Sequence, residues 1–257
     1  MANLIRTAKS GSHELAAYNI RVEPQDAATF FGTPVLPDPV LAPAEVLKAA
    51  RADQASSDDG YLFLHTLELA MAISPDEDSA VVDFMVALFR ACGCTGVGRV
   101  ARTRKEMPLL ICGENRHTKT DVCIVNDNDE IRLLVQEDKR HMEGFDPEPQ
   151  LIAEAIAALT ANNRTRVRTL SLPPLHSKVM PGITLTGTTP TFYKIPVSID
   201  LVTAVQGGVY PQQETVVRVH VPALPRPARR WSEGMTPLDN RRIILACYEA
   251  FKQFVNQ

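Results

Sequence analysis

Two short apolar runs separated by a polar turn set the tightest limit on how this chain can fold. The segments TKTDVCIVND (residues 118–127) and EIRLLVQEDKR (residues 130–140) are rich in Val, Ile and Leu over the length of a strand. The alternating Asn and Asp residues where they meet favour a turn. We therefore predict a β-hairpin whose turn is centred near residue 128.

This turn also predicts which side chains gather at the far end of the hairpin. Side chains on a strand switch face at every residue, so Glu137 and Lys139 project the same way. Asp121 is then diagonal to Glu137, and two carboxylates and a lysine converge at one end. The facing pairs predicted from this turn are Val125 with Ile131, Cys123 with Leu133, and Asp121 with Val135.

Two carboxylates beside a lysine suit hydrolysis of a phosphodiester with the help of a metal ion. Mg²⁺ prefers oxygen ligands, and a bound metal can polarise a phosphodiester and lower the pKa of a bound water. We predict that Asp121 and Glu137 bind Mg²⁺ or Mn²⁺ and that Lys139 positions or activates the water. The alternative is a solvated strand face with a surface salt bridge, worth roughly 0–1 kcal/mol.

Helix and strand signals surround the hairpin. Upstream, residues 74–93 predict a helix that begins at Ser74-Pro75 and ends at Gly93, because proline favours the first turn and glycine the end of a helix. Residues 97–113 predict a strand interrupted by Pro108.

Downstream of the hairpin, residues 146–163 predict a helix with Pro149 near its start, and residues 182–198 predict one or two strands. The predicted order is helix, strand, strand, strand, helix, strand, which indicates an α/β fold with a mixed central sheet flanked by helices. The core stripe of the downstream helix is Ile152, Ile156 and Leu159.

Within this order of elements, the spacing of Asp121, Glu137 and Lys139 resembles the core motif of the PD-(D/E)xK nuclease superfamily. One departure is Thr120, which stands before Asp121 where the motif has a proline that varies widely across the superfamily. The resemblance implies a restriction-endonuclease-like core over about residues 75–200, with N- and C-terminal helical additions. It also implies metal-dependent hydrolysis of nucleic acid.

The resemblance implies supporting residues on the two flanking helices. Gln150 holds the place of a polar residue that often faces the site, with Glu154 one turn later on the same side. Asp83 fits the place of a further metal-binding acid on the upstream helix. The alternatives are an exposed first-turn residue for Gln150 and the polar face of an amphipathic helix for Asp83. Glu106 and Glu114 are weaker candidates.

Three further stretches resemble a group of largely uncharacterised fungal proteins that bear the same core. They are PQLIAEAIAAL, GTTPTFYKIPV and PLDNRRIILACYEAFKQF, which begin at residues 149, 187 and 237. This likeness continues to the end of the chain and says nothing about activity.

Length and composition fit an ordinary globular chain. It has 257 residues, of which 45% are hydrophobic and 22% charged, enough to bury a full core in one domain. We predict an N-terminal arm over residues 1–60 and a single α/β domain over residues 61–257, which ends in a helix over about residues 237–255.

The sequence contains no clear signal for a membrane span or for secretion. No apolar run approaches the roughly 20 residues needed to span a bilayer, and the first residues lack the apolar core of a signal peptide. Five cysteines without framework spacing fit free thiols. We therefore expect an intracellular protein, in cytoplasm or nucleus, without a membrane partner.

The net charge of −3 argues against constitutive coating of nucleic acid but permits local basic contacts. We expect nucleic acid, with DNA first, as the partner, and a homodimer is an open alternative. Phosphate contacts would come from clustered basic residues, although such clusters also keep strand edges soluble. The clusters are Arg99, Arg102, Arg104 and Lys105; Arg164, Arg166 and Arg168; and Arg226, Arg229 and Arg230.

Two other functions compete with a nuclease. The same fold can serve as a catalytically inactive interaction module, in which the acids and the lysine form a salt-bridged pocket. A zinc site would use Cys92, Cys94, Cys112 and His117, but their spacing is irregular for structural zinc and favours core cysteines.

Overall fold

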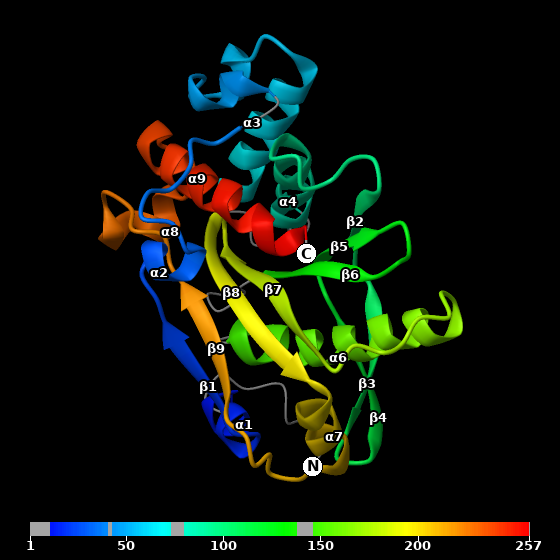
Figure 1. Ribbon diagram of the computed structural model, residues 1–257. Coiled ribbons are helices and arrows are strands. Elements are labelled where there is room, and N and C mark those ends of the chain that lie inside the picture. Colours follow the sequence, from blue (N-terminus) through cyan, green and yellow to red (C-terminus); the bar gives the residue numbers. More distant parts are fainter. Residues whose placement is uncertain (1–10, 41–42, 73–79, 138–145, 257) are drawn as a thin grey trace.

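The computed structural model describes residues 11–40, 43–72, 80–137 and 146–256. Its centre is a mixed seven-stranded sheet flanked by helices (Figure 1). The strands of this sheet are β1 (Ile20–Pro24), β2 (Arg99–Thr103), β5 (Val122–Asn126), β6 (Ile131–Glu137), β7 (Ser177–Thr186), β8 (Thr189–Ser198) and β9 (Thr215–His220). Their order is β1-β9-β8-β7-β6-β5-β2, with β1 parallel to β9, β6 parallel to β7, and the other pairs antiparallel. The predicted α/β class with a mixed sheet is confirmed.

Helices cover both faces of this sheet (Figure 1). They are α1 (Gly11–Ala17), α2 (Ala27–Phe31), α3 (Asp58–Met71), α4 (Ala80–Ala91), α6 (Pro147–Arg168), α7 (Ile199–Gly207), α8 (Arg230–Glu233) and α9 (Leu238–Val255). Buried residues of α2, α3, α4 and α9 form one core, and those of α1, α6 and α7 form a second core on the opposite face. No helix within the described ranges is both long enough and apolar enough to cross a membrane.

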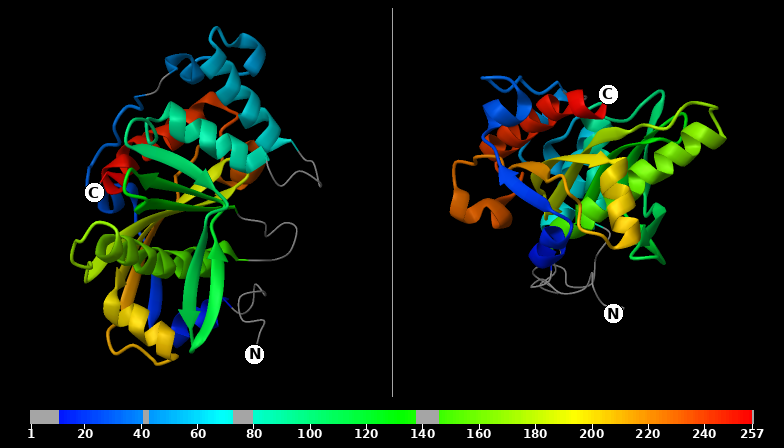
Figure 2. Two further views of the ribbon diagram at one scale, coloured as in Figure 1. Left: turned by 90° about the vertical axis from the view of Figure 1, so that its right-hand side faces the viewer. Right: turned by 60° about the horizontal axis from the view of Figure 1, so that its bottom comes forward.

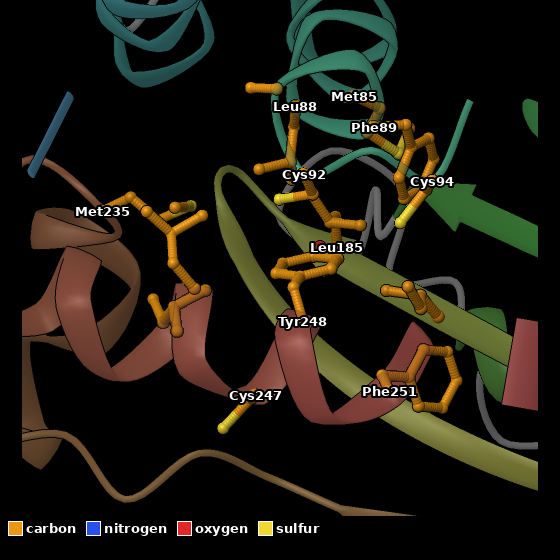
Figure 3. Close-up of a cluster of buried hydrophobic side chains, with 14 of the residues drawn as sticks. Met85, Leu88, Phe89, Cys92, Cys94, Leu185, Met235, Cys247, Tyr248 and Phe251 are labelled. Carbon is orange, nitrogen blue, oxygen red and sulfur yellow. The ribbon is translucent and has the colours of Figure 1, made fainter. Parts of the chain in front are cut away.

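The first core joins α4 and α9 to the sheet (Figure 3). Phe89 of α4 and both Tyr248 and Phe251 of α9 are buried, and the ring centroids of Phe89 and Tyr248 are 6.3 Å apart. Cys92 and Cys247 are also buried here, as expected for core cysteines. The buried side of the predicted C-terminal helix therefore packs on the sheet.

The second core is built around α6. The Asp146 side chain caps this helix by accepting a hydrogen bond from the Glu148 backbone N–H. The predicted stripe of Ile152, Ile156 and Leu159 is buried, as expected for the sheet-facing side of the helix. The helix runs to Arg168, five residues beyond the predicted end at residue 163.

The hairpin of β5 and β6 is present, but its register differs from the predicted one. Val125 pairs with Ile131 as predicted, and then a β-bulge between Ile124 and Val125 shifts the pairing by one residue. Val122, and not Asp121, therefore lies opposite Val135. The predicted pairs Asp121–Val135 and Cys123–Leu133 are wrong, because the extra residue of the bulge reverses the faces beyond it.

The predicted strand over residues 97–113 is two strands. It breaks after β2 at Arg104, whose φ of 53° is outside the range of a strand. The second part, β3 (Glu106–Ile111), pairs with an unpredicted strand, β4 (Glu114–Lys119), through a turn at Cys112 and Gly113, which both have positive φ. This separate hairpin packs on α6 (Figure 2, left).

The predicted N-terminal arm contributes to the fold. Residues 20–24 form the edge strand β1 beside β9, and Phe30 and Phe31 of α2 are buried in the first core. A five-residue strand bounded by polar residues has little periodicity, which is why the sequence did not indicate it. Residues Ala44–Leu47 of this arm form a single 3₁₀ turn. The predicted helix start at Ser74-Pro75 lies outside the described residues.

Candidate active site

The two acids predicted as metal ligands lie at the same end of the β5–β6 hairpin, but their carboxylates do not share one face as predicted. The shifted register places Asp121 with Cys123 toward the second core and Glu137 with Val135 toward the first core. Asp121 directly precedes β5, and Glu137 is the last residue of β6. The Glu137 backbone N–H donates a hydrogen bond to Asp121 Oδ2 at 2.8 Å. Glu137 is buried and Asp121 is half-buried, so both carboxylates are partly shielded from water. Lys139 lies outside the described residues, and its role stays a prediction.

Thr120 holds the two strands together beside Asp121. Its side chain is fully buried, and Thr120 Oγ1 lies 3.0 Å from the carbonyl oxygens of both Val122 and Val135. The single hydroxyl proton is shared between these acceptors. A proline at this position would have no hydroxyl and could not make this bond to both strands.

Helix α6 brings a polar pair against the same end of the hairpin. Gln150 and Glu154 are one turn apart, and Gln150 Nε2 donates to Glu154 Oε1 at 3.1 Å. Thr118 Oγ1 is 3.5 Å from the same oxygen, at the limit of a hydrogen bond. Glu154 is 0% exposed, and its Oε2 atom has no hydrogen-bond partner among the described residues. By this geometry one oxygen of the buried carboxyl group has no partner among the described residues, although the Thr120 hydroxyl is close enough to lower the pKa of Glu154.

Electrostatics link Glu154 to Asp121. Burial raises the pKa of Glu154 from its ordinary 4.5 to about 8, the hydrogen bond from Gln150 opposes this rise, and the charge of Asp121 adds to it. The two carboxyl groups are thus close enough to repel each other when both are ionised. In the protein without a bound cation, Glu154 is mostly protonated at neutral pH.

This shift predicts a pH dependence of stability. Between about pH 4.5 and pH 8, the folded protein keeps a proton on Glu154 that the unfolded chain releases, so stability falls as pH rises through this range. The slope is up to about 1.4 kcal/mol per pH unit. We expect Glu154→Gln to remove this decline, as measured by urea unfolding at pH 5, 7 and 9 with a chelator present. Parallel pH profiles for wild type and variant would contradict the shift.

Gln136 is a site residue that the sequence did not single out. It directly precedes Glu137 and is buried, and its Oε1 atom has no hydrogen-bond partner among the described residues. Because Val122 pairs with Val135, Gln136 is the next residue opposite Asp121 in the observed register. The available signal was a polar residue directly after the apolar run Leu133–Val135.

The remaining acidic candidates lie elsewhere. Asp83 is exposed in the first turn of α4 and forms no hydrogen bond or ion pair with a described residue. Glu106 is exposed on β3, and Glu114 pairs with Arg116 at the other end of the β3–β4 hairpin. The described geometry therefore brings Asp121 beside the α6 pair and joins Glu137 to Asp121 through its backbone N–H, and none of these three acids is joined to that group by a hydrogen bond or ion pair among the described residues.

The residues of the zinc alternative are not brought together. Cys92 and Cys94 are buried in the first core, where burial raises the pKa of both thiols. Cys112 is exposed beside Tyr18 Oη at 3.2 Å, and His117 is exposed on β4. Across residues 11–40, 43–72, 80–137 and 146–256, no group of three or more His, Cys, Asp or Glu side chains is arranged to hold a metal ion.

Members of two basic clusters lie at the turn of the β5–β6 hairpin, and several basic residues are paired with acids. Arg166 binds Glu130 at the turn of the β5–β6 hairpin, which is the opposite end of β6 from Glu137. Arg102 and Lys105 contact Asp129 at the same turn, and Arg226 pairs with Glu233 and Asp239 near α9.

Comparison of the sequence with models of known protein families gives no match, and comparison with curated proteins gives none. The functional argument therefore rests on the geometry of the site.

Proposed function

We propose that this protein is a metal-dependent nuclease that hydrolyses phosphodiester bonds of nucleic acid, with DNA as the first candidate substrate. The observation that supports this most is the 2.8 Å hydrogen bond that joins Glu137 to Asp121 at the end of the hairpin. The PD-(D/E)xK resemblance assigns two metal-binding acids to this place. The chain order α4, β2, β5, β6, α6, β7 supports a restriction-endonuclease-like core, with the β3–β4 hairpin as an insertion.

The polar groups at this end of the sheet fit a hard divalent cation. Asp121, Glu137 and Glu154 offer carboxylate oxygens, which Mg²⁺ and Mn²⁺ prefer. Buried polar atoms in folded proteins nearly always have a partner, so the unsatisfied Oε2 of Glu154 favours a further ligand at this position. A cation would also relieve the repulsion between Glu154 and Asp121 that raises the pKa of Glu154.

The residues of the chain would then have distinct roles. Asp121 and Glu137 would hold the metal, which when bound would polarise the scissile phosphate and acidify a water. Gln150 would fix the orientation of Glu154 through the hydrogen bond between their side chains. Lys139 is the predicted group that positions or activates the attacking water.

A cleavage assay tests this function. We expect the wild-type protein to cut DNA with Mg²⁺ or Mn²⁺ and not with a chelator, and Glu137→Ala to lower the rate by at least about 100-fold. Single- and double-stranded DNA and RNA identify the substrate class. The matched control is Glu114→Ala, which removes an exposed glutamate at the far end of the β3–β4 hairpin and is expected to cut at the wild-type rate.

Thermal unfolding with and without metal gives an independent measurement, because a ligand that binds only the folded state raises its stability. We expect Mn²⁺ to raise the melting temperature of the wild type and not of Glu137→Ala. Absence of cleavage of every substrate, together with no shift in melting temperature, would refute the nuclease proposal and favour the interaction module.

A further inference from the structure

The chain contains one tryptophan, Trp231, and its side chain is 58% exposed on α8. Large aromatic side chains are usually mostly buried, so an exposed ring on a fixed backbone suggests a surface for a ligand. The backbone here is fixed, because Thr189 Oγ1 donates to the Arg230 carbonyl oxygen at 2.7 Å. Arg226 also binds Glu233, the last residue of α8.

Arg230 lies beside this ring and has no acidic partner among the described residues. Its guanidinium carbon is 6.0 Å from the centroid of the Trp231 ring. Its Nε atom is buried and has no hydrogen-bond partner in the described part of the chain. Burial is the cause that lowers the pKa of Arg230, with no carboxylate opposing it. The neighbouring Arg229 side chain is 71% exposed and reaches Glu233 only at 3.6 Å.

This aromatic and basic pair lies at the same end of the sheet as the candidate active site. Glu137 on β6 pairs with Leu185 on β7, one residue before the end of that strand. The β7–β8 turn follows at once, and Thr189, which bonds Arg230, is the first residue of β8. Two strand spacings, about 10 Å, therefore separate Glu137 from Thr189 across the sheet.

We propose that Trp231 stacks on an unpaired base of a single-stranded nucleic acid while Arg230 and Arg229 contact its phosphates. This inference rests on the proposed function, since it assigns the substrate class of the same site. A flat exposed ring offers stacking only to a base that has left a helical stack, whereas duplex binding depends mainly on phosphate contacts. The guanidinium of Arg230, which has no acidic partner in the described part of the chain, matches the charge of the backbone that links such bases.

The single tryptophan makes the contact directly measurable. We titrate the full-length protein with oligothymidylate or oligouridylate in the presence of a chelator, so that no cutting occurs, and follow Trp231 fluorescence. Stacking is expected to quench this emission in a saturable manner, and binding is expected to weaken as salt rises. The tighter of the two oligonucleotides identifies the preferred sugar.

Variants are compared with dye-labelled oligonucleotides. We expect Trp231→Ala to weaken binding about 10-fold and Trp231→Phe to retain most of it. Arg230→Gln is expected to weaken binding and to reduce its salt dependence. The control is Tyr210→Ala, which removes another aromatic side chain, 61% exposed, from the segment after α7 and should leave binding unchanged.

The outcomes separate this inference from the nuclease proposal. Oligonucleotide binding without quenching, unchanged binding by Trp231→Ala, or quenching by duplex alone would overturn the stacking role even if the protein cuts nucleic acid. Saturable quenching by a single strand, lost affinity in Trp231→Ala and no cleavage under any condition would support the stacking role and refute the nuclease.

Discussion

Replacing Asp121 with asparagine is expected to lower metal-dependent cleavage by about 10²–10³-fold while leaving the fold intact. The amide oxygen of asparagine can still accept the hydrogen bond that the Glu137 N–H donates to Asp121 Oδ2. The hairpin end therefore keeps its geometry and loses only a negative charge. A hard divalent cation depends on that charge for its affinity, so both metal binding and cleavage should fall.

The same variant has a second readout that needs no metal. The charge of Asp121 is one cause of the raised pKa of Glu154. In Asp121→Asn this pKa should be lower, and the decline in stability with rising pH should end at a lower pH than in the wild type. Urea unfolding between pH 5 and pH 9 with a chelator measures this change. A cooperative unfolding transition would show that Asp121→Asn is folded, and an earlier end of the decline would show that the carboxyl groups of Asp121 and Glu154 interact in the wild type.

Asp129→Asn is the matched control, because it makes the same substitution at the turn end of the same hairpin. Asp129 has a φ of 57°, which asparagine tolerates, and pairs with Lys105 at 3.0 Å on the surface. It is expected to cut at the wild-type rate. Wild-type cleavage by Asp121→Asn would contradict its role as a ligand. An equal loss in both variants would mean that the hairpin as a whole, and not the site, is sensitive.

Hydrophobic pattern was enough to predict the elements that build the site. Both strands of the β5–β6 hairpin, the buried stripe of α6 and the place of Asp121 and Glu137 at one end of the hairpin follow from residue type and turn position. The pairing of Val125 with Ile131 follows from the turn as well. Beyond that pair the register could not be predicted. Residues 122–125 are all buried, so no alternation of apolar and polar residues marks which side chain faces which core.

The bulge changed the neighbours of Asp121 without moving it from the end of the hairpin. In the observed register the Asp121 carboxylate accepts a hydrogen bond from the Glu137 backbone N–H. Asp121 lies opposite Gln136, on the face of the sheet that α6 covers. This is why Glu154, predicted only as a neighbour of Gln150, is electrostatically coupled to Asp121. The full burial of Glu154 depends on tertiary packing, which a local pattern does not contain.

Arg241 is another residue whose role depends on tertiary packing, and its loss should give the largest change in stability. Within the polar sequence DNRR it has the pattern of a solvated helix face, yet it is 0% exposed. Its guanidinium donates to the carbonyl oxygens of Val46, Ala49, Ala50, Met235 and Thr236. It therefore ties the segment before α3 to the start of α9. Burial lowers the pKa of Arg241 to about 10, so it stays charged at neutral pH.

We expect Arg241→Met to lower the free energy of unfolding by about 3–5 kcal/mol, because it leaves buried carbonyl groups without donors. Arg241→Lys should have an intermediate effect, since one ammonium nitrogen cannot reach acceptors on both sides of a guanidinium. Arg242→Met is the control: this neighbour is exposed and should change stability by less than about 0.5 kcal/mol. Urea unfolding of the three variants and the wild type measures these changes in the free energy of unfolding. Equal stability of Arg241→Met and Arg242→Met would mean that water replaces the guanidinium, and that the segment before α3 is held by its apolar contacts alone.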